Sequence, residues 1–497
     1  MSTIRTRFAP SPTGHLHIGG ARTALFNYLI ARQAGGTFLL RIEDTDRSRH
    51  DESAVPKICA DLRWLGIEWD EGIEVGGEHG PYRQSERLDI YRKYIDQLLD
   101  EGKAYCAFET SEELAALRAE AEEAKGGFRY KRPDVLPTRE EAEKARTEGK
   151  PVVVRFRCPP KDVVVVDENF GTITIPAAEQ EDFVIQKADG YPTFYLANVV
   201  DDALMRISLV CRGQEFLGQT WRQTILRDAL GFDQPKLLHL PLIMDMKGRK
   251  LSKRDGDVDV EAFRLAGYLP TALVNFIVLL GWNPGGDREK FTMPELIEHF
   301  SPQRIGRSNA KFDREKLLAF NTEGIASAAS AEPDRLLGAL KGYLSASGAS
   351  IPTGDDDLLR RVLKACKGIR TFADLRAKCD VLFGPDDAYS YDEKAVGQVL
   401  EKDGGSGYAA LAEFRGVLAA CEWTAEKLEA AVKEHCERKQ VRMDKVAQPI
   451  RVAVTGKAIS PPIHDTLLFL GREKALARID RCLALRKGGG ATTGAAG

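Results

Sequence analysis

Two short stretches beside glycines carry residues that could act on a phosphate. The first is His17-Ile18-Gly19-Gly20, which ends a loop and opens an apolar helical pattern. Two glycines at a helix start let a ligand approach the backbone without meeting a Cβ atom. The unpaired N–H groups and the helix dipole there favour an anion. His17 could donate a hydrogen bond to a phosphate oxygen, although a tight turn with a capping histidine would use the same residues.

The second stretch is Lys250-Leu251-Ser252-Lys253-Arg254, which follows a strand-like apolar run and lies between Gly248 and Asp255-Gly256. Three cations in five residues on such a loop suit a triphosphate. Charge that builds on a leaving pyrophosphate would be stabilised there mostly in the transition state. Taken alone, the stretch could also be an exposed basic turn.

The elements around the first stretch predict an α/β domain. Residues 4–8 alternate as a short strand does, and apolar residues then recur at helical spacing until Gly35-Gly36. Residues 37–42 predict a second strand. Strand, loop, helix and strand form the opening unit of a Rossmann-like, doubly wound parallel sheet, which is the fold class that we expect.

The pattern changes after residue 87. A charged helix and three strand-like runs, at residues 152–156, 163–166 and 172–175, predict an α+β insertion. Parallel-sheet character resumes near residues 207–210 and 237–240, and the chain is mostly helical after about residue 260. The last ten residues, GGGATTGAAG, cannot bury a core, so we expect a disordered tail at 488–497.

The composition is that of a soluble globular protein with several domains, since 43% of its 497 residues are hydrophobic and 29% are charged. No apolar run approaches the roughly 20 residues that span a bilayer. Because no signal-like segment opens the chain either, a cytoplasmic protein without a membrane partner is expected. None of the nine cysteines forms a CxxC pair, so no zinc or other protein-bound metal is expected.

A net charge of −3 leaves any contact with nucleic acid to local patches. Residues 360–380 hold seven Lys or Arg against two Asp, with Arg360, Lys364 and Lys367 on one helical face. Residues 430–487 hold thirteen Lys or Arg against six acids, including Arg442 and Arg451. Either patch could equally be a solvated surface.

The two phosphate-binding candidates together resemble the HIGH and KMSKS signatures of class I aminoacyl-tRNA synthetases, in the forms HIGG and KLSKR about 230 residues apart. Several stretches are also similar to bacterial glutamyl-tRNA synthetases: RFAPSPTG at 7–14, RIEDTD at 41–46, GPYRQSER at 80–87, NVVDD at 198–202, KVAQPIR at 445–451 and residues 467–475. The resemblance covers the chain except for its last ten residues.

The resemblance assigns roles to individual residues. It implies glutamate-binding roles for Arg7, Ala9, Ser11, Glu43, Phe194, Asn198 and Arg212. It implies ATP-binding roles for His17, Gly19, Gly20, Glu215, Lys250, Leu251, Ser252, Lys253 and Arg254, with His17, Lys250 and Lys253 acting in catalysis. It implies tRNA-binding roles for Arg360, Lys364, Lys367, Arg442 and Arg451. The arginines suit carboxylates, because a planar guanidinium matches a carboxylate in two hydrogen bonds.

The resemblance also implies a reaction, in which ATP activates L-glutamate to glutamyl-adenylate and the glutamyl group passes to the 3′-terminal adenosine of tRNA(Glu). Mg²⁺ would accompany ATP, tRNA would bind before activation, and the protein would be a monomer. The expected domains are a split catalytic domain at 1–87 and 198–255, an acceptor-stem-binding insertion at 88–197, a stem-contact helical domain at 256–324 and an anticodon-binding region at 325–487.

Two positions depart from the family pattern: Phe194 replaces the usual tyrosine, and Gln214 replaces the usual acid. If residue 194 lies in a strand, Tyr195 points away from the pocket. Two other functions stay open, a catalytically silent tRNA-binding or regulatory protein and a small-molecule nucleotidyltransferase of the same superfamily. Intact HIGG and KLSKR stretches count against the first, and the long basic C-terminal part counts against the second. Whether tRNA(Gln) is also charged stays open.

Lys253 gives the first prediction. The substitution Lys253→Ala should lower the turnover of aminoacylation by about 10²–10³, the scale for one lost transition-state donor. The affinity for tRNA, measured by filter binding, should change little. An equal loss of tRNA affinity would contradict the role of Lys253 on the phosphates.

Overall fold

The computed structural model describes residues 3–46, 51–123, 128–252, 258–386 and 389–487. The chain forms two compact units, which are described separately. The first contains Met1–Ala262 and Pro270–Leu317, and the second contains Phe263–Leu269 and Leu318–Gly497. Lys253 and Arg254 and the tail at 488–497 lie outside the described residues, so the predictions on them stay predictions.

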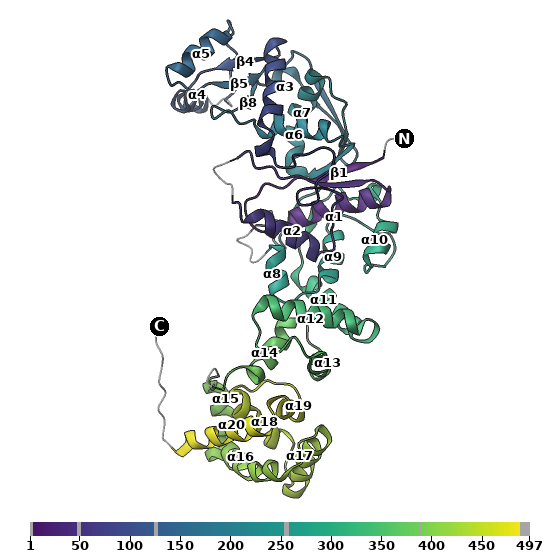
Figure 1. Cartoon of the computed structure of the whole chain (residues 1–497), viewed down its shortest axis with the longest axis vertical. Helices are drawn as coiled ribbons and strands as arrows, with labels where there is room; N and C mark the ends of the chain where they lie inside the picture. The colour runs from purple at the N-terminus through teal and green to yellow at the C-terminus, as the bar shows by residue number, and fades with distance from the viewer. Residues whose placement is uncertain (1–2, 47–50, 124–127, 253–257, 387–388, 488–497) are drawn as a thin grey trace. The chain divides into compact units, whose positions relative to one another are not determined.

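The first unit opens with the predicted strand, helix and strand. Strands β1 (Arg5–Phe8), β2 (Thr37–Leu40) and β3 (Glu71–Gly72) form a parallel sheet in that order, and α1 (Ile18–Gln33) connects the first two (Figure 1). The buried face of α1 between Ala21 and Ala31 is mostly apolar, with Arg22 and Asn27 as its buried polar residues. Gly36 must be glycine, because a Cβ there would lie 2.0 Å from the carbonyl oxygen of Ile4. The sequence prediction is confirmed here.

A second sheet joins two parts of the chain that the sequence analysis assigned to different domains. Its order is β7 (Gly171–Ile175), β6 (Val163–Asp167), β10 (Lys236–Leu240) and β9 (Leu209–Gly213). Strands β9 and β10 are parallel, and β6 pairs with β10 through Asp167 and Leu237. The hairpin of the predicted insertion therefore extends the sheet of the flanking segments.

The third sheet is antiparallel and consists of β4 (Ala104–Ala107), β5 (Val153–Phe156) and β8 (Phe183–Gln186). It shares one hydrophobic core with α3 (Leu88–Asp100), α6 (Phe194–Leu204) and α7 (Thr220–Leu230). Phe194 opens a helix, so the argument that Tyr195 would point away from the pocket in a strand does not apply. Residues 196–202 of α6 are all buried, Asn198, Asp201 and Asp202 among them.

The chain's other elements before residue 314 are α2 (Ala54–Trp64), η2 (Gln84–Glu86), α4 (Ser111–Glu123), α5 (Arg139–Thr147), η3 (Ala177–Glu179), η4 (Gln214–Gln219), β11 (Ile243–Met244), α8 (Val260–Leu265), α9 (Pro270–Val278), α10 (Met293–His299), η6 (Pro302–Arg304) and β12 (Ala310–Lys311). Strands β11 and β12 form a short parallel pair. Residues 88–197 contain helices α3 to α5 and strands β4 to β8, which agrees with the predicted α+β character of the insertion.

From residue 314 every regular element of the described chain is helical. The elements are α11 (Arg314–Ala331), α12 (Pro333–Ser347), α13 (Asp356–Ala365), α14 (Phe372–Phe383), α15 (Glu393–Ala395), η7 (Val396–Leu400), α16 (Lys402–Ala420), α17 (Ala425–Lys439), α18 (Asp444–Thr455), α19 (Ile463–Leu470) and α20 (Arg472–Lys487). Helices α16 to α20 close around a core that includes Phe414, Ile450 and Leu467. None of the described helices has the length and apolarity needed to cross a membrane.

Candidate active site

A cavity of about 780 Å³ opens in the first unit beside the carboxyl ends of β1 and β9. Ligands of open α/β sheets bind at such strand ends. The cavity is lined by all seven residues predicted to bind glutamate and by four of those predicted to bind ATP: Arg7, Ala9, Ser11, Glu43, Phe194, Asn198 and Arg212, with His17, Gly19, Gly20 and Glu215. The fold therefore gathers residues from four separate segments around one space.

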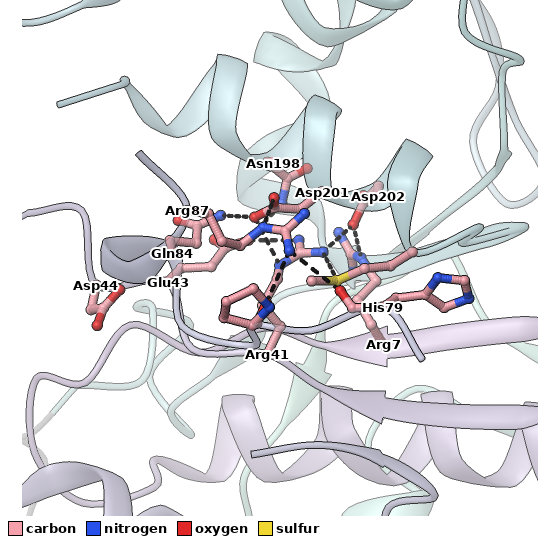
Figure 2. Close-up of polar contacts among 12 residues, drawn as sticks. Arg7, Arg41, Glu43, Asp44, His79, Gln84, Arg87, Asn198, Asp201 and Asp202 are labelled. Atoms are coloured by element: carbon pink, nitrogen blue, oxygen red, sulfur yellow. Dashed lines mark hydrogen bonds and ion pairs between the residues drawn. The ribbon is translucent and has the colours of Figure 1, made fainter. Parts of the chain in front are cut away.

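A buried ion network lies against this cavity. Helix α6 presents Asp202 to two guanidinium groups from the first sheet, as Figure 2 shows. Arg7 donates from Nε to Asp202 Oδ1 over 3.1 Å, and Arg41 Nη1 lies 2.8 Å from the same oxygen. Arg227 of α7 lies 3.6 Å from Oδ2. One carboxylate thus holds β1, the end of β2 and two helices together.

Two further carboxylates complete the network. Glu43 accepts from Arg41 Nη2 over 2.9 Å and from Asn198 Nδ2 over 2.7 Å. Asp201 accepts from Arg87, Gln84 and Tyr91 over 2.7, 2.9 and 2.8 Å. Both carboxylates therefore have fixed positions, and Glu43 is fixed at the cavity wall.

The network changes proton affinities in the direction expected of paired charges. Burial alone would raise the pKa of Asp202, but Arg7, Arg41 and Arg227 outweigh it and hold that pKa below the usual range of a carboxyl group. Burial alone would lower the pKa of Arg41, but Asp202, Glu43 and Asp201 raise it above its usual value. Asp202 and Arg41 are therefore both charged at neutral pH.

Arg212 is the exception among these arginines. Its Nε donates to His239 Nε2 over 3.0 Å and its Nη2 to Thr220 Oγ1 over 2.9 Å, but it makes no ion pair with a described residue. Its Nη1 is buried without a hydrogen-bond partner in the described part of the chain. Burial and the charge of Arg7 lower the pKa of Arg212 to about 9. A buried cation of this kind is suited to a ligand that brings its own negative charge.

The start of α1 lies next to the segment that follows the KLSKR stretch. Ile18 N donates to Val258 O over 2.9 Å, and Val260 N donates to Leu16 O over 2.9 Å. The segment at residues 258–260 therefore lies against the start of the HIGG stretch, although the two are distant in sequence. His17 caps α1 by accepting from Gly19 N over 3.0 Å, so the capping alternative is confirmed as its role in this conformation. A Cβ on Gly20 would lie 3.0 Å from Leu16, so this glycine also permits close packing.

The KLSKR stretch is described as far as Ser252. Lys250 Nζ lies 4.0 Å from Glu215 Oε1, a residue of the cavity wall. Leu251 is buried and bonded through its N–H to Ile243 O over 3.0 Å, so its side chain serves the fold. Lys250, Leu251 and Ser252 are not lining residues of the cavity. The described residues contain no group of three His, Cys, Asp or Glu side chains that could hold a metal ion.

The predicted tRNA contacts lie in the second unit and have different surroundings. Lys364 and Lys367 are exposed, and with Arg360 they border an apolar cavity of about 500 Å³. Arg360 pairs with Asp334, and Arg442 lies 3.1 Å from Asp444. Arg451 donates to Ser460 Oγ over 2.8 Å, and burial lowers its pKa. Arg451 therefore has a contact within the fold that the sequence did not predict.

Several residues of the site had no predicted role. Phe216 stacks on Phe194 with ring centroids 5.6 Å apart, and the Arg212 guanidinium lies 5.3 Å from its ring centroid. Lys187 of the insertion lines the cavity and donates to Thr45 O over 3.0 Å. Arg41, Asp201 and Asp202 belong to family-like stretches, which was a signal of importance, whereas nothing in the sequence singled out Phe216 or Lys187.

Comparison with known families gives this geometry a context. The family described as "tRNA synthetases class I (E and Q), catalytic domain" matches residues 3–319, and the family described as "Anticodon binding domain" matches residues 335–483. The chain belongs to the class I tRNA synthetases of the glutamate and glutamine group. The first match spans the cavity, the ion network and both signature stretches of this synthetase.

Relatives of the same family cover nearly the whole chain. The glutamate–tRNA ligase of Geotalea uraniireducens is 40% identical over 491 residues, 98% of this chain and 100% of its own length. That of Heliobacterium modesticaldum is 41% identical and covers 98% of each chain. A crystal structure of a glutamate tRNA ligase from Elizabethkingia meningosepticum, in complex with its amino acid, is 32% identical with a TM-score of 0.76, covering 97% of this synthetase and 99% of its own chain.

The network around Asp202 yields a stability prediction. Asp202→Asn leaves three guanidinium groups less compensated in the core, so it should lower the free energy of unfolding by about 3–5 kcal/mol. Because the folded state depresses the pKa of Asp202, its contribution is complete above about pH 4 and is lost as the pH falls further. Calorimetry of the variant and wild-type proteins at several pH values measures both effects.

The control is Asp287→Asn, which removes an exposed carboxylate of the same unit and should change the stability by less than about 0.5 kcal/mol. Equal unfolding curves for the two variants would contradict the assigned weight of the network.

Proposed function

We propose that this chain is a glutamate–tRNA ligase, which activates L-glutamate with ATP and transfers it to the 3′-terminal adenosine of tRNA(Glu). The observation that carries the proposal is that two charged residues of opposite sign line one cavity. Arg212 is buried and has no ion pair with a described residue, and Glu43 is held in place by Arg41. Glutamate has two carboxylates and one ammonium group. The cavity wall includes two arginines, Arg7 and Arg212, and the acid Glu43.

Each group of glutamate has a counterpart in the cavity. We assign Arg212 and Arg7 to its carboxylates, and Glu43 to its ammonium group with help from the backbone at Ala9 and Ser11. Asn198 and Phe194 border the same space. Glutamine would place a neutral amide against the cation and leave it uncompensated. Such unpaired buried charges cost about 2–5 kcal/mol, which supports selection of the acid.

ATP would lie across the start of α1. We assign its contacts to His17, Gly19, Gly20 and Glu215, and its phosphates to Lys250, Ser252, Lys253 and Arg254. Neither half-reaction needs a protein nucleophile, because the glutamate carboxylate attacks the α-phosphorus and a ribose hydroxyl of tRNA then attacks the adenylate. Catalysis is positioning and electrostatic stabilisation. Mg²⁺ would enter with the ATP phosphates, its common mode of binding.

The remaining parts would serve tRNA. We propose that residues 88–197 bind the acceptor stem, residues 256–324 contact the stem and residues 325–487 bind the anticodon. The match of residues 335–483 to the anticodon binding domain family supports the last assignment. Arg360, Lys364 and Lys367 are the contacts that we favour, because all three are exposed. Arg360 and Lys364 lie on α13, whereas Lys367 lies beyond its end at Ala365, so the three do not share one helical face as the sequence predicted. We also propose a cytoplasmic monomer.

The decisive experiment is ATP–pyrophosphate exchange with glutamate or glutamine, each with and without tRNA(Glu). We expect exchange with glutamate, in the presence of tRNA, and far less with glutamine. Exchange without tRNA would contradict the proposed order of binding. No exchange from folded protein that still binds tRNA would overturn the enzymatic function.

Arg212→Gln tests the amino-acid site. The variant should lower kcat/KM for glutamate by about 10²–10³-fold, because a buried charge partner of the substrate is lost. The preference for glutamate over glutamine should fall with it. The thermal unfolding midpoint should change little, because Arg212 makes no ion pair with a described residue. Aminoacylation kinetics and calorimetry provide the two measurements.

Arg222→Gln is the matched control, since Arg222 lies on α7 but does not line the cavity. Its kinetics should resemble those of the wild type. If Arg212→Gln kept full glutamate preference, another residue would have to hold the side-chain carboxylate.

A further inference from the structure

Arg212 belongs to a chain of three hydrogen-bonded side chains on neighbouring strands. It donates to His239 of β10, which contacts Asp167 of β6. His239 is its partner in the register of β9 and β10, and His239 Nε2 accepts the Nε–H of Arg212 over 3.0 Å. His239 Nδ1 in turn lies 2.6 Å from Asp167 Oδ2, at the end of β6. These three side chains are buried, with exposed fractions of 6% for Arg212, 0% for His239 and 2% for Asp167.

The chemistry of the three groups fixes the position of the imidazole proton. A guanidinium Nε can only donate, so His239 Nε2 must be the unprotonated nitrogen. Nδ1 then carries the proton and donates it to Asp167. Asp167 also accepts the backbone N–H groups of His239, Asn169 and Phe170 over 3.0, 3.0 and 2.8 Å. The histidine is therefore a neutral acceptor with a single tautomer.

A neutral acceptor behind Arg212 has a consequence that a carboxylate would not have. A carboxylate at that place would orient the guanidinium but would also neutralise it and compete with an acidic ligand. The imidazole orients the guanidinium and leaves its charge uncompensated. With Nε held by His239 and Nη2 by Thr220, the plane of the guanidinium is set and Nη1 has no described partner.

We propose that Asp167 and His239 are positioning residues for glutamate recognition: Asp167 fixes the tautomer of His239, and His239 orients Arg212 toward the side-chain carboxylate of glutamate. The inference rests on the proposed role of Arg212. Neither positioning residue lines the cavity, so neither touches the substrate.

The arrangement predicts a pH dependence. The charged groups that act on His239 are Asp167 from β6, Arg212 from β9 and Arg7 from β1, and Thr220 lies 3.3 Å from Nε2. Burial is the largest influence and, with the two arginines, lowers the pKa of His239 despite Asp167. Below that pKa, Nε2 of His239 is protonated. Its N–H then faces the Nε–H of Arg212 and displaces the guanidinium group. Because the pKa of His239 is lowered, the KM for glutamate should stay constant near pH 6.5, the usual histidine value, and rise only at more acidic pH.

Two substitutions of His239 separate its two contacts. His239→Asn keeps a donor for Asp167 but loses the acceptor for Arg212. We expect it to raise the KM for glutamate by about 10–100-fold, the scale of one hydrogen bond to a charged group. Its kcat and its KM for ATP should change little, and its glutamate preference should fall. His239→Gln can place an amide oxygen near the former Nε2, so its KM at neutral pH should remain close to that of the wild type.

The pH profile provides the readout that a merely structural role would not change. In aminoacylation assays, the wild-type KM for glutamate should rise on the acidic side, and His239→Gln should lose that rise because an amide does not titrate. A profile unchanged in His239→Gln would overturn the proposal. If His239→Asn fails to fold, the comparison of wild type with His239→Gln still decides.

Arg212→Lys distinguishes failure of this inference from failure of the proposed function. Lysine lacks the Nε–H that His239 accepts. Arg212→Lys should raise the KM for glutamate, and adding His239→Asn should raise it little further. If Arg212→Lys has no effect, the role of Arg212 is wrong. If Arg212→Lys raises the KM for glutamate but His239→Asn does not, only the positioning role of His239 is overturned. The same conclusion follows if the KM increase of the double variant equals the product of the increases of the two single variants.

Discussion

The structure of the catalytic unit depends on the ionic contacts of Asp202. This carboxylate joins guanidinium groups from β1, from the end of β2 and from α7, while its own helix covers them. Buried charges are stable only when their partners stay in place, because removal of one partner leaves the others desolvated and unpaired. The strands and helices that carry these residues therefore cannot shift independently. The cavity is lined by residues of those same elements, Arg7 and Asn198 among them.

The division of charge at the cavity is the basis of the proposed selection for glutamate. Arg41 is compensated by carboxylates of the protein and Arg7 pairs with Asp202 through its Nε, whereas Arg212 is oriented by a histidine and a hydroxyl group. The paired charges hold the strands and helices together, and Arg212 is the buried cation of the cavity wall without an ion pair to a described residue. Glu43, fixed by Arg41 and Asn198, supplies the opposite sign in the same space. A zwitterionic acid matches this pattern better than any neutral amino acid does.

Much of this arrangement could be predicted from the sequence, because it depends on local patterns and on short family-like stretches. The opening strand and helix, the gathering of the site residues around one cavity and the helical C-terminal part all followed from such signals. The element that contains residue 194 was left open, because residues 196–202 are all buried and show no exposed polar face. The contact of Asp167 with His239 joins residues 72 positions apart, and only strand pairing brings them together. The bond from Gly19 N to His17 shows the capping role of this histidine, and its contact with ATP stays a prediction.

The pairing of β6 with β10 has a consequence for how this protein could be divided or recombined. Residues 88–197 look like an independent module in the sequence, but their hairpin continues the sheet of β9 and β10, and their core is shared with α6 and α7. Excision would leave an open strand edge on β10 and expose apolar side chains such as Val199 and Ile225. It would also remove Lys187 from the cavity wall. The insertion cannot be exchanged between relatives as a cassette unless its sheet register and its half of the core are carried with it.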